Sequence, residues 1–145
     1  MSSTARRRRR SGCPISLALD TIGDAWTLLI VRDLMFKWRE SFKDFLQAEE
    51  GIASNVLSER LQRLECAGIV VKRRDAADAR RLVYRLTEKG MALAPVLVEL
   101  VLWSARFEQT DAPPAVVKAM RADRDAFIAS MRQTWKASNR LPRAE

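Results

Sequence analysis

The apolar residues of this chain recur at helical spacing in several stretches, which glycine, proline or polar residues separate. The first stretch runs from Ile15 to Ile22 and ends at Gly23, which is typical of a helix stop. Asp24 then suits the N-cap of a helix from Ala25 to about Phe36. The apolar positions of this helix are Trp26, Leu29, Ile30 and Leu34. The pattern predicts a helix that serves as core scaffold.

Two shorter helices in tandem follow a polar link. Ser41 and Asp44 are three residues apart and resemble a capping box. The apolar face of the helix that they begin consists of Phe42, Phe45 and Leu46. Gly51 supplies a permissive backbone position in the turn. Ser54 is the expected N-cap of the next helix.

This next helix has two distinct faces and ends at Gly68. Its inward face is made by Leu57, Leu61 and Leu64, at i, i+4 and i+7. Its outward face carries Asn55, Ser58, Glu59 and Gln62, flanked by Arg60 and Arg63. A helix that is only solvated more often carries Glu/Lys pairs, whereas Asn, Gln, Ser and Arg side chains hydrogen-bond well to base edges. The outward face therefore indicates a helix that reads DNA.

Two β-type runs come next, joined by a charged loop. In the second run, Leu82, Tyr84 and Leu86 alternate with Arg81, Val83 and Arg85, the pattern of a half-buried strand. The loop from Asp75 to Arg81 is too long for a tight turn and should project from the body. It is either a solvated hairpin loop or a wing that lays Arg80 and Arg81 against phosphate or into a minor groove. The helix pair before it favours the wing.

The rest of the chain carries more apolar surface than so small a body needs for its own core. Thr87 is a suitable cap for a long helix from Glu88 to about Gln109, with a kink expected near Pro95. Pro113-Pro114 then separates a last helix, from about Ala115 to Lys136. The apolar positions are Leu93, Ala94, Val96, Leu97, Leu100, Val101, Trp103 and Phe107, then Val116, Met120, Phe127, Met131 and Trp135. We expect a second copy of the chain to cover this surface, because so large an exposed patch is rare on a monomer.

Positive charge is concentrated at the N-terminus. The 145 residues suffice for one domain with a core, and the net charge is +8, from 26 Lys and Arg against 18 Asp and Glu. Residues 1–12 contain almost nothing apolar and are predicted to form a disordered basic tail. The arginines of this tail are Arg6, Arg7, Arg8, Arg9 and Arg10. Such a tail most often finds phosphates, and a solvated tail without function is the alternative.

The composition also excludes several classes of function. His is absent, which removes the commonest general base and the commonest metal ligand. Cys13 and Cys66 are too few for a disulfide framework or a structural zinc site. We therefore expect no enzymatic activity, no metal and no cofactor. No apolar run is long enough to span a bilayer and the N-terminus lacks a secretory signal, so a cytoplasmic protein with no membrane partner is expected.

Six segments occur in an order and with a spacing that are highly specific when taken jointly. They are Cys13-Pro14, Leu19–Ile30, Phe42–Phe45, Gly51–Leu61, Ala67–Val70 and Tyr84–Gly90. Over about residues 13–103, they resemble the HxlR family of bacterial winged helix-turn-helix transcription regulators, close relatives of the MarR group. The resemblance implies a mainly α fold with a small β-hairpin (α+β), extended by N- and C-terminal dimerisation helices. It also implies a homodimer on a pseudo-palindromic operator in double-stranded DNA, with one recognition helix per subunit in a major groove.

The resemblance also assigns parts of the chain to DNA contacts. The recognition helix corresponds to Ser54 through Leu64, and the wing to Arg74 through Leu82. Glu59 either accepts a hydrogen bond from cytosine or orients Arg63 through an i, i+4 pair. The expected DNA-binding residues are Ser54, Asn55, Ser58, Glu59, Gln62, Arg63, Arg80 and Arg81, with Arg6 to Arg10 as candidate contacts to the DNA backbone.

The chain departs from the family pattern in three places. Asn55 and Ser58 stand where a basic residue and Thr are frequent, so no known operator sequence is carried over. Residues 75–81 lack the prolines that are usual in the wing. The arginine tail and the helix after Pro114 lie largely outside the shared segments. The expected units are a basic tail at 1–12, a winged helix-turn-helix domain with its dimer helix at 13–110, and a C-terminal helix at 113–136 in the dimer interface.

Three alternatives to a plain DNA-binding regulator remain. Some family members sense oxidants or electrophiles through a cysteine at the position of Cys13, although the sequence favours a small residue packed against the dimer helix, because free cysteines are common buried residues. A small-molecule effector is another alternative, with a cleft lined by Trp26, Trp38, Trp103, Phe107 and Trp135, although aromatic residues at helical spacing are more often core. A winged helix that binds protein is the third, and the basic wing argues against it.

Overall fold

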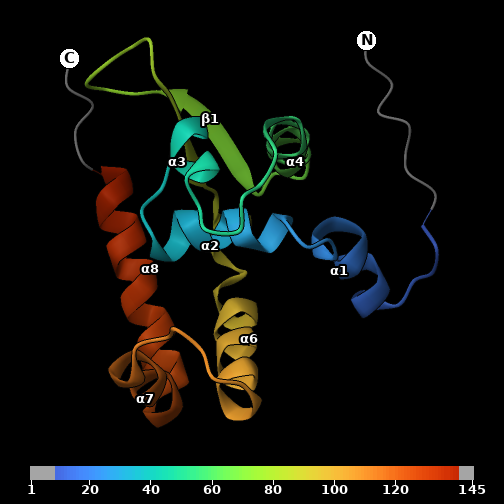
Figure 1. Ribbon diagram of the computed structural model, residues 1–145, viewed down its shortest axis with the longest axis vertical. Helices are drawn as coiled ribbons and strands as arrows, with labels where there is room; N and C mark the ends of the chain where they lie inside the picture. Colours follow the sequence, from blue (N-terminus) through green and yellow to red (C-terminus); the bar gives the residue numbers. More distant parts are fainter. Residues whose placement is uncertain (1–8, 141–145) are drawn as a thin grey trace.

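Eight helices and one β-hairpin make up the part of the chain that the computed structural model describes, residues 9–140 (Figure 1). The elements are α1 (Pro14–Ile22), α2 (Thr27–Phe36), α3 (Phe42–Leu46), α4 (Ser54–Cys66), β1 (Val70–Arg74), β2 (Leu82–Leu86), α5 (Glu88–Met91), α6 (Ala94–Phe107), α7 (Pro114–Ala122) and α8 (Arg124–Arg140). The mainly α fold with a small β-hairpin is confirmed.

The main core lies between α2, α3, α4 and the hairpin. It is formed by Ile30, Val31, Phe45, Leu57, Leu61, Leu64, Val70 and Tyr84, among others. The three leucines of α4 are at most 2% exposed, so the inward face predicted for this helix is confirmed. The rings of Phe45 and Tyr84 meet with their centroids 6.0 Å apart, which joins α3 to the hairpin.

Two predicted N-caps, Ser41 and Thr87, were right, and two others were displaced. The capping box is present, with the amide of Asp44 donating to Ser41 Oγ at 3.2 Å and the amide of Ser41 donating to Asp44 Oδ2 at 3.1 Å. Helix α2 begins at Thr27, two residues later than predicted, because Asp24 caps the preceding turn and accepts from two successive amides there. Ser54 is inside α4, since Ala53 has the extended backbone of the N-cap.

The alternation predicted for β2 was wrong at two positions, because Leu82 is exposed and Val83 is buried. Val83 is buried although its neighbour Tyr84 is buried as well. The reason is that the link before α3 lies along the second edge of this strand, where Ser41 pairs with Val83 and the amide of Tyr84 donates to the carbonyl of Glu40 at 2.7 Å. One edge of β2 therefore contacts this link, while its other edge pairs antiparallel with β1.

Both predicted long helices are divided in two. The first is broken between α5 and α6, and Pro95 lies in the first turn of α6, where a missing N–H costs no helical hydrogen bond. The second is broken at Asp123, whose carboxylate accepts the amide of Ala126 at 3.0 Å and so begins α8. The sequence signalled the kink, but Asp123 was not recognised as a cap.

The C-terminal helices fold back onto the rest of the chain. Helix α7 packs on α6 through a second cluster of Val98, Leu102, Val117 and Met120. Helix α8 continues toward the hairpin, where Trp135 Nε1 donates to the carbonyl of Leu86 at 3.2 Å and Arg132 pairs with Glu88 at 2.6 Å. The apolar stripe of these helices, which the sequence led us to place against a second copy, is thus largely covered by the same chain.

The expectation that no apolar run is long enough to span a bilayer was wrong. By length and composition, the segment Glu88–Phe107 is apolar enough to cross a bilayer. A core helix has the same composition, and residues of this segment such as Met91, Ala94 and Val98 are buried in the two clusters. The apolar character of the segment is therefore explained in part by internal packing.

Candidate nucleic-acid interface

Helix α4 and the hairpin lie at one end of the molecule, opposite α6 and α7 (Figure 1). The leucine face of α4 is in the core, which turns its polar face to solvent. The exposed residues on this face are Ser54, Asn55, Ser58, Glu59 and Gln62, with Arg63 half-buried beside them. The structure thus brings the six expected helix residues together on one surface.

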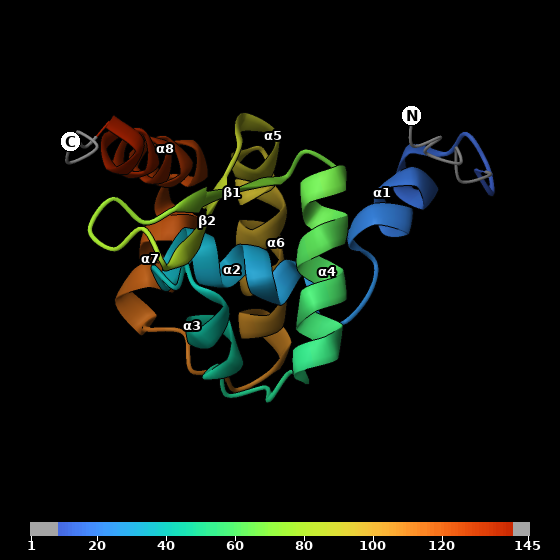
Figure 2. The same cartoon turned by 90° about the horizontal axis from the view of Figure 1, so that it is seen from above.

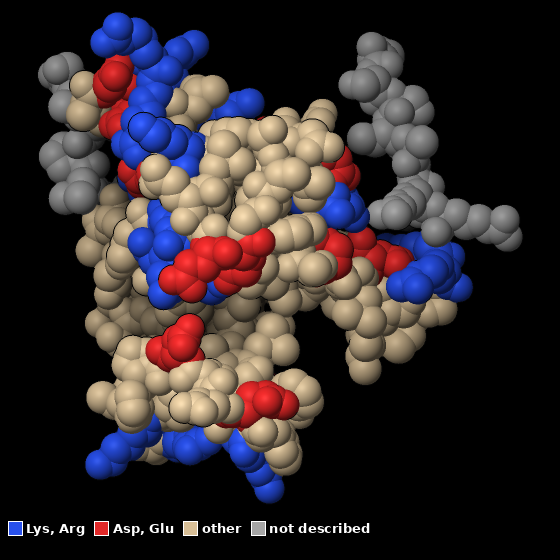
Figure 3. All heavy atoms as spheres, viewed as in Figure 1, with Lys and Arg blue, Asp and Glu red and all other residues tan. Residues whose placement is uncertain are grey.

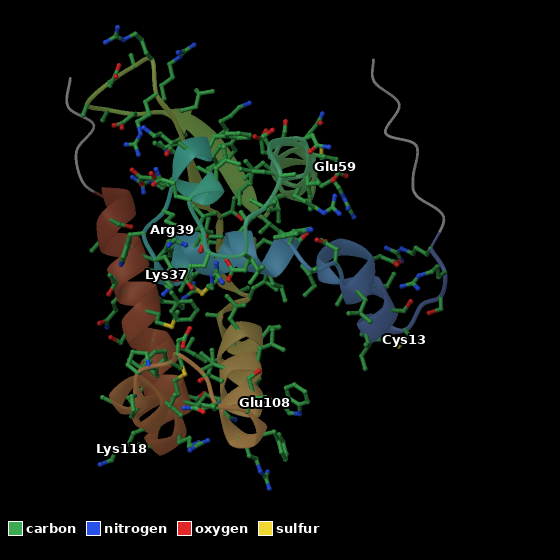
Figure 4. The ribbon with its side chains drawn as sticks, in the orientation of Figure 1. Cys13, Lys37, Arg39, Glu59, Glu108 and Lys118 are labelled. Atoms are coloured by element: carbon green, nitrogen blue, oxygen red, sulfur yellow. The ribbon has the colours of Figure 1, made fainter. Side chains whose placement is uncertain are left out.

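Glu59 connects the two arginines of this helix. It pairs with Arg63 at 3.6 Å, the i, i+4 arrangement, and it also contacts Arg60. Its carboxylate (Figure 4) therefore has partners within the helix, which fits the alternative in which Glu59 orients Arg63.

Arg60 holds α4 to the start of α2. Its Nε donates to Asp24 Oδ1 at 3.0 Å, and both side chains are mostly buried. Burial opposes ionisation of Asp24, but hydrogen bonds from the Thr27 hydroxyl, from the amide of Trp26 and from Arg60 outweigh it, so the pKa of this carboxyl lies well below its ordinary value. Arg60 is therefore a positioning residue for the polar face. The sequence did not indicate this role, because its partner Asp24 is distant along the chain.

The two wing arginines have different surroundings. Arg80 is 92% exposed at its side chain, and within residues 9–140 it pairs only with Asp78, two residues away. Arg81 is held by Asp75 at 2.8 Å and Asp44 at 3.2 Å. The amide of Ala77 and the guanidinium of Arg81 lower the pKa of the Asp75 carboxyl. Arg80 is thus available to phosphate, while Arg81 fixes the wing to α3.

The sequence interpretation left two exposed basic residues of β1 out of the candidate DNA contacts, although it placed Arg74 in the wing. Arg73 and Arg74 are exposed on β1, next to the loop, and the guanidinium of Arg74 donates to the carbonyl of Ala79 at 2.8 Å. Lys and Arg spheres accordingly gather at the wing (Figure 3). The signal for both was present in the run Lys72-Arg73-Arg74.

The end of the basic tail lies near α4. Arg6, Arg7 and Arg8 fall outside the described residues, while Arg9 and Arg10 are exposed and Arg10 pairs with Asp20 at 2.8 Å. Both border a hollow of about 1110 Å³ between α1 and α4, together with Glu59, Gln62 and Arg63. The described arginines of the tail are therefore on the same side as the polar face of α4.

The described cysteines are both exposed, and they lie on different elements. Cys13 is the N-cap residue of α1, at the outer end of that helix (Figure 4), and Cys66 is the last residue of α4. Across residues 9–140, no three His, Cys, Asp or Glu side chains form a group that could hold a metal ion.

Helix α1 projects from the body, and none of its residues is buried (Figure 2). Its Ile15 and Leu19 are exposed. Helix α6 also has an exposed apolar face, on which Trp103 and Phe107 pack with their ring centroids 6.0 Å apart. Two helices of this chain therefore present apolar surface to solvent.

The arrangement of a helix pair followed by a wing agrees with the comparison to known families. The sequence model of the family described as HxlR-like helix-turn-helix matches residues 21–112, more than half of the chain. The chain belongs to this family. The resemblance stated from the motifs is confirmed, and the winged helix-turn-helix fold with it. Helices α7 and α8 of this HxlR-family chain begin after the matched residues.

Relatives of this HxlR-family protein are transcription regulators by name. YvaP of Bacillus subtilis (strain 168), an uncharacterized HTH-type transcriptional regulator, is 35% identical over 96 residues, which are 66% of this chain and 88% of YvaP. YodB of the same organism, an HTH-type transcriptional regulator, is 33% identical over 96 residues, which are 66% of this chain and 85% of YodB.

Solved structures of HxlR-like regulators superpose on the same part of the chain. The reduced form of YodB aligns with a TM-score of 0.56 and 32% identity over 67% of this chain and 95% of YodB. The quinone-bound form of YodB aligns with a TM-score of 0.55 and 33% identity, over 66% of this chain and 100% of YodB. The redox regulator HypR, in its oxidized form, aligns with a TM-score of 0.58 and 26% identity, over 68% of this chain and 100% of HypR.

Proposed function

We propose that this transcriptional regulator is a sequence-specific DNA-binding protein that acts as a homodimer on a pseudo-palindromic operator. The observation that supports this best is the polar face of α4, which lies exposed at the same end of the molecule as the wing with Arg80. A helix of this kind fits a major groove, and the wing reaches the adjacent backbone. It works without catalysis, in the cytoplasm on the nucleoid.

Affinity and sequence preference come from different residues in this proposal. Phosphate contacts from Arg80 and from the arginine tail, Arg6 to Arg10, supply most of the affinity and make it depend on salt. Asn55, Ser58 and Gln62 meet base edges, and Arg63 joins them from the flank of α4. Ser54 lies at the helix N-terminus, where its exposed amide and hydroxyl suit a phosphate.

The homodimer rests on the exposed apolar faces of α1 and α6. A chain of this size rarely leaves Ile15, Leu19, Trp103 and Phe107 exposed without a partner. A twofold pair through these helices presents two α4 helices, which is the arrangement that a pseudo-palindromic site requires.

The test separates base reading from backbone contact. In Gln62→Ala, affinity for the selected operator should fall by about 1–3 kcal/mol while affinity for random DNA stays unchanged, because base contacts carry the preference. In Arg80→Ala, both affinities should fall together and the salt slope should drop by about 1, because a phosphate contact is lost. Fluorescence anisotropy with labelled duplexes at several salt concentrations measures both. Equal losses on operator and random DNA in Gln62→Ala would refute the assignment of α4.

A second candidate function, oxidant or electrophile sensing through Cys13, is favoured by the exposed position of this cysteine at the start of α1. Among the relatives, HypR is a redox regulator and YodB has been solved in a quinone-bound form. A modified Cys13 would change the helix that we assign to the dimer.

The prediction is a loss of operator binding after mild oxidation or quinone treatment of the wild type and of Cys66→Ser, but not of Cys13→Ser. The anisotropy assay measures it, with thiol titration as the control for modification. Operator binding that is insensitive to a fully modified Cys13 would contradict the sensing function.

A further inference from the structure

A pocket of about 190 Å³ lies between α2, α5 and α8, away from the surface that we assign to DNA. Ten residues line it: Leu34, Met35, Phe36, Trp38, Met91, Phe127, Ser130, Met131, Thr134 and Trp135. Five of them lie on α2, on α5 or in the link after α2, within the family core, and the other five lie on α8. Since α8 follows the matched residues 21–112, this pocket depends on the C-terminal extension of this chain.

The lining selects a chemical class of ligand. None of these ten residues carries a charge, and their surface consists mainly of aromatic rings and thioethers. A charged molecule would lose its hydration there without gaining a counter-charge, whereas a neutral aromatic molecule meets rings and polarizable sulfur. A cavity of about 150 Å³ in another protein holds benzene, so one or two fused rings are the appropriate size.

Two hydroxyl groups on α8 add a polar feature to the wall. Thr134 Oγ1 donates to the carbonyl of Ser130 at 3.1 Å, which leaves the lone pairs of this hydroxyl able to accept. The Ser130 hydroxyl can both donate and accept. An aromatic ligand that bears one hydroxyl group therefore finds hydrogen-bonding partners on a single face of the pocket.

Trp38 gives the pocket an unusual wall. It lies in the link between α2 and α3 and has a φ of 54°, in the left-handed region that bulky residues rarely occupy. More than half of its surface is exposed, although it is a large aromatic residue. Strained backbone of this kind clusters at ligand-binding sites and switches, where a contact with a ligand compensates for the cost.

The pocket is connected to the base of the wing. Trp38 and Trp135 also line an adjacent small cavity, together with Tyr84, Arg85 and Leu86 of β2. The indole of Trp135 donates to the carbonyl of Leu86 at 3.2 Å, so a shift of α8 acts directly on the end of this strand. Occupancy of the pocket would thus reach the hairpin that carries the wing.

We propose that this pocket is an effector site for a small, neutral aromatic molecule with a hydroxyl group. The regulatory part rests on the proposed DNA-binding function, while ligand binding itself does not. A ligand between α2 and α8 changes the position of α8 and, through Trp135, that of β2, so that the affinity for DNA changes.

Nuclear magnetic resonance on the ¹⁵N-labelled full chain tests the binding, with 2-naphthol as the probe. The chain has four tryptophans, and each gives one indole N–H signal. The signals of Trp38 and Trp135, which line the pocket, should shift and saturate, while those of Trp26 and Trp103 should stay in place. The anion 2-naphthoate should bind at least tenfold more weakly. Absence of shifts, or equal shifts of all four signals, would overturn the site.

Variants of α8 test whether the shifts of the indole signals come from binding in the pocket. Thr134→Phe fills the pocket from an exposed position of the helix and should weaken 2-naphthol binding at least tenfold. Gln133→Phe, the neighbouring exposed position that does not line the pocket, is the matched control and should bind as the wild type does. Thermal unfolding verifies that both fold, and Ser130→Phe is a second filling variant. Unchanged binding in both filling variants would contradict the proposal.

The effect on DNA is measured by anisotropy with a selected operator. Saturating 2-naphthol should change the affinity at least threefold in the wild type and in Gln133→Phe, but not in Thr134→Phe. An unchanged affinity, together with shifted indole signals, would overturn the effector role. If the chain bound no DNA even without 2-naphthol, the proposed function and the effector role would both fail, and the indole signals would still decide whether the pocket binds.

Discussion

At the scale of single residues, the arginines of the surface that we assign to DNA divide into those that are held by the protein and those that are available. Arg60 is tied to Asp24 and Arg81 to Asp75 and Asp44, whereas Arg80 is almost fully exposed. An arginine engaged by carboxylates orients a segment, and an exposed one is able to neutralise a phosphate. We therefore assign Arg60 and Arg81 to positioning and Arg80 to contact.

Arg60→Ala should lower the free energy of unfolding by about 1.5–3 kcal/mol, because it removes a mostly buried hydrogen bond between charged groups. Chemical denaturation followed by circular dichroism measures this. Gln62→Ala, two residues away on the exposed face, should change it by less than about 0.5 kcal/mol.

A double-mutant cycle with Asp24→Asn checks that the loss comes from the pair. If the effects of the two substitutions added up, Arg60 would not be anchored by Asp24, and the positioning role would be wrong.

Sequence alone predicts the direction of a side chain better than its partner. The leucines of α4 follow the helical period, so the inward face and the polar face were both predicted. The partners of Arg81 were not, because Asp44 is 37 residues away and only the fold brings it near. The sequence interpretation grouped Arg81 with Arg80 as a DNA contact, and its pairing with two carboxylates leads us to propose a positioning role instead.

At the scale of elements, α2 and the turn after α3 are joined by a group of charges. Arg32 donates to Glu50 Oε2 at 3.0 Å and to Asp33 Oδ1 at 2.8 Å, and Arg39 adds a bond to Asp33 at 3.2 Å. The carboxylate of Asp33 is buried, and the guanidinium groups of Arg32 and Arg39 compensate for its charge. This group of charges holds α2 and the turn after α3 together, directly before α4.

The Glu50 carboxylate should make stability depend on pH. The hydrogen bond from Arg32 lowers the pKa of Glu50 from 4.5 to about 2. A carboxyl whose pKa is depressed in the folded state stabilises the fold fully above its ordinary pKa, and this contribution is lost as the pH falls toward the folded value. Glu50→Gln should therefore lower Tm at pH 6.5, and the difference from the wild type should shrink at pH 3.

Thermal unfolding by circular dichroism measures the difference at both pH values, with Glu49→Gln, an exposed neighbour, as the control that should change little. A difference that is the same at pH 6.5 and pH 3 would show that the Glu50 charge does not stabilise the fold.

The elements themselves were largely predictable, because their signals are local. The capping box at Ser41 and the apolar period of α4 lie within a few residues, and both are found. The division of the C-terminal segment at Asp123 was missed, because the apolar stripe continues across it. The burial of Val83 was missed as well, since it depends on Ser41, which is distant in sequence.

At the scale of the whole molecule, one part of the apolar surface of the helices packs within the chain and another part is exposed. The stripe of α7 and α8 packs against α6 and α2, which the sequence could not indicate, because a stripe that faces its own chain looks the same as one that faces a partner. The exposed apolar residues of α1 and α6 remain, and we assign them to a second copy. Helix α1 has no buried residue of its own, which this assignment explains.

Trp103→Glu should convert a dimer into a monomer, because this side chain is 66% exposed on α6 and a charge there would have to be buried at the proposed interface. Sedimentation velocity at micromolar concentration measures the change. Leu46→Glu, which charges an exposed apolar residue at the end of α3, should leave the dimer intact. A wild-type monomer, or a variant that stays dimeric, would contradict the assignment of α6.

The most direct test of the central claim is selection of bound duplexes from a random DNA pool by the full-length chain. The account predicts enrichment of two inverted half-sites, with centres separated by about 10 base pairs or a multiple of one helical turn. The same selection with Gln62→Ala should relax specific positions within each half-site. A bound pool with no enriched sequence, or with a single half-site and no inverted copy, would contradict a homodimer that reads DNA through α4.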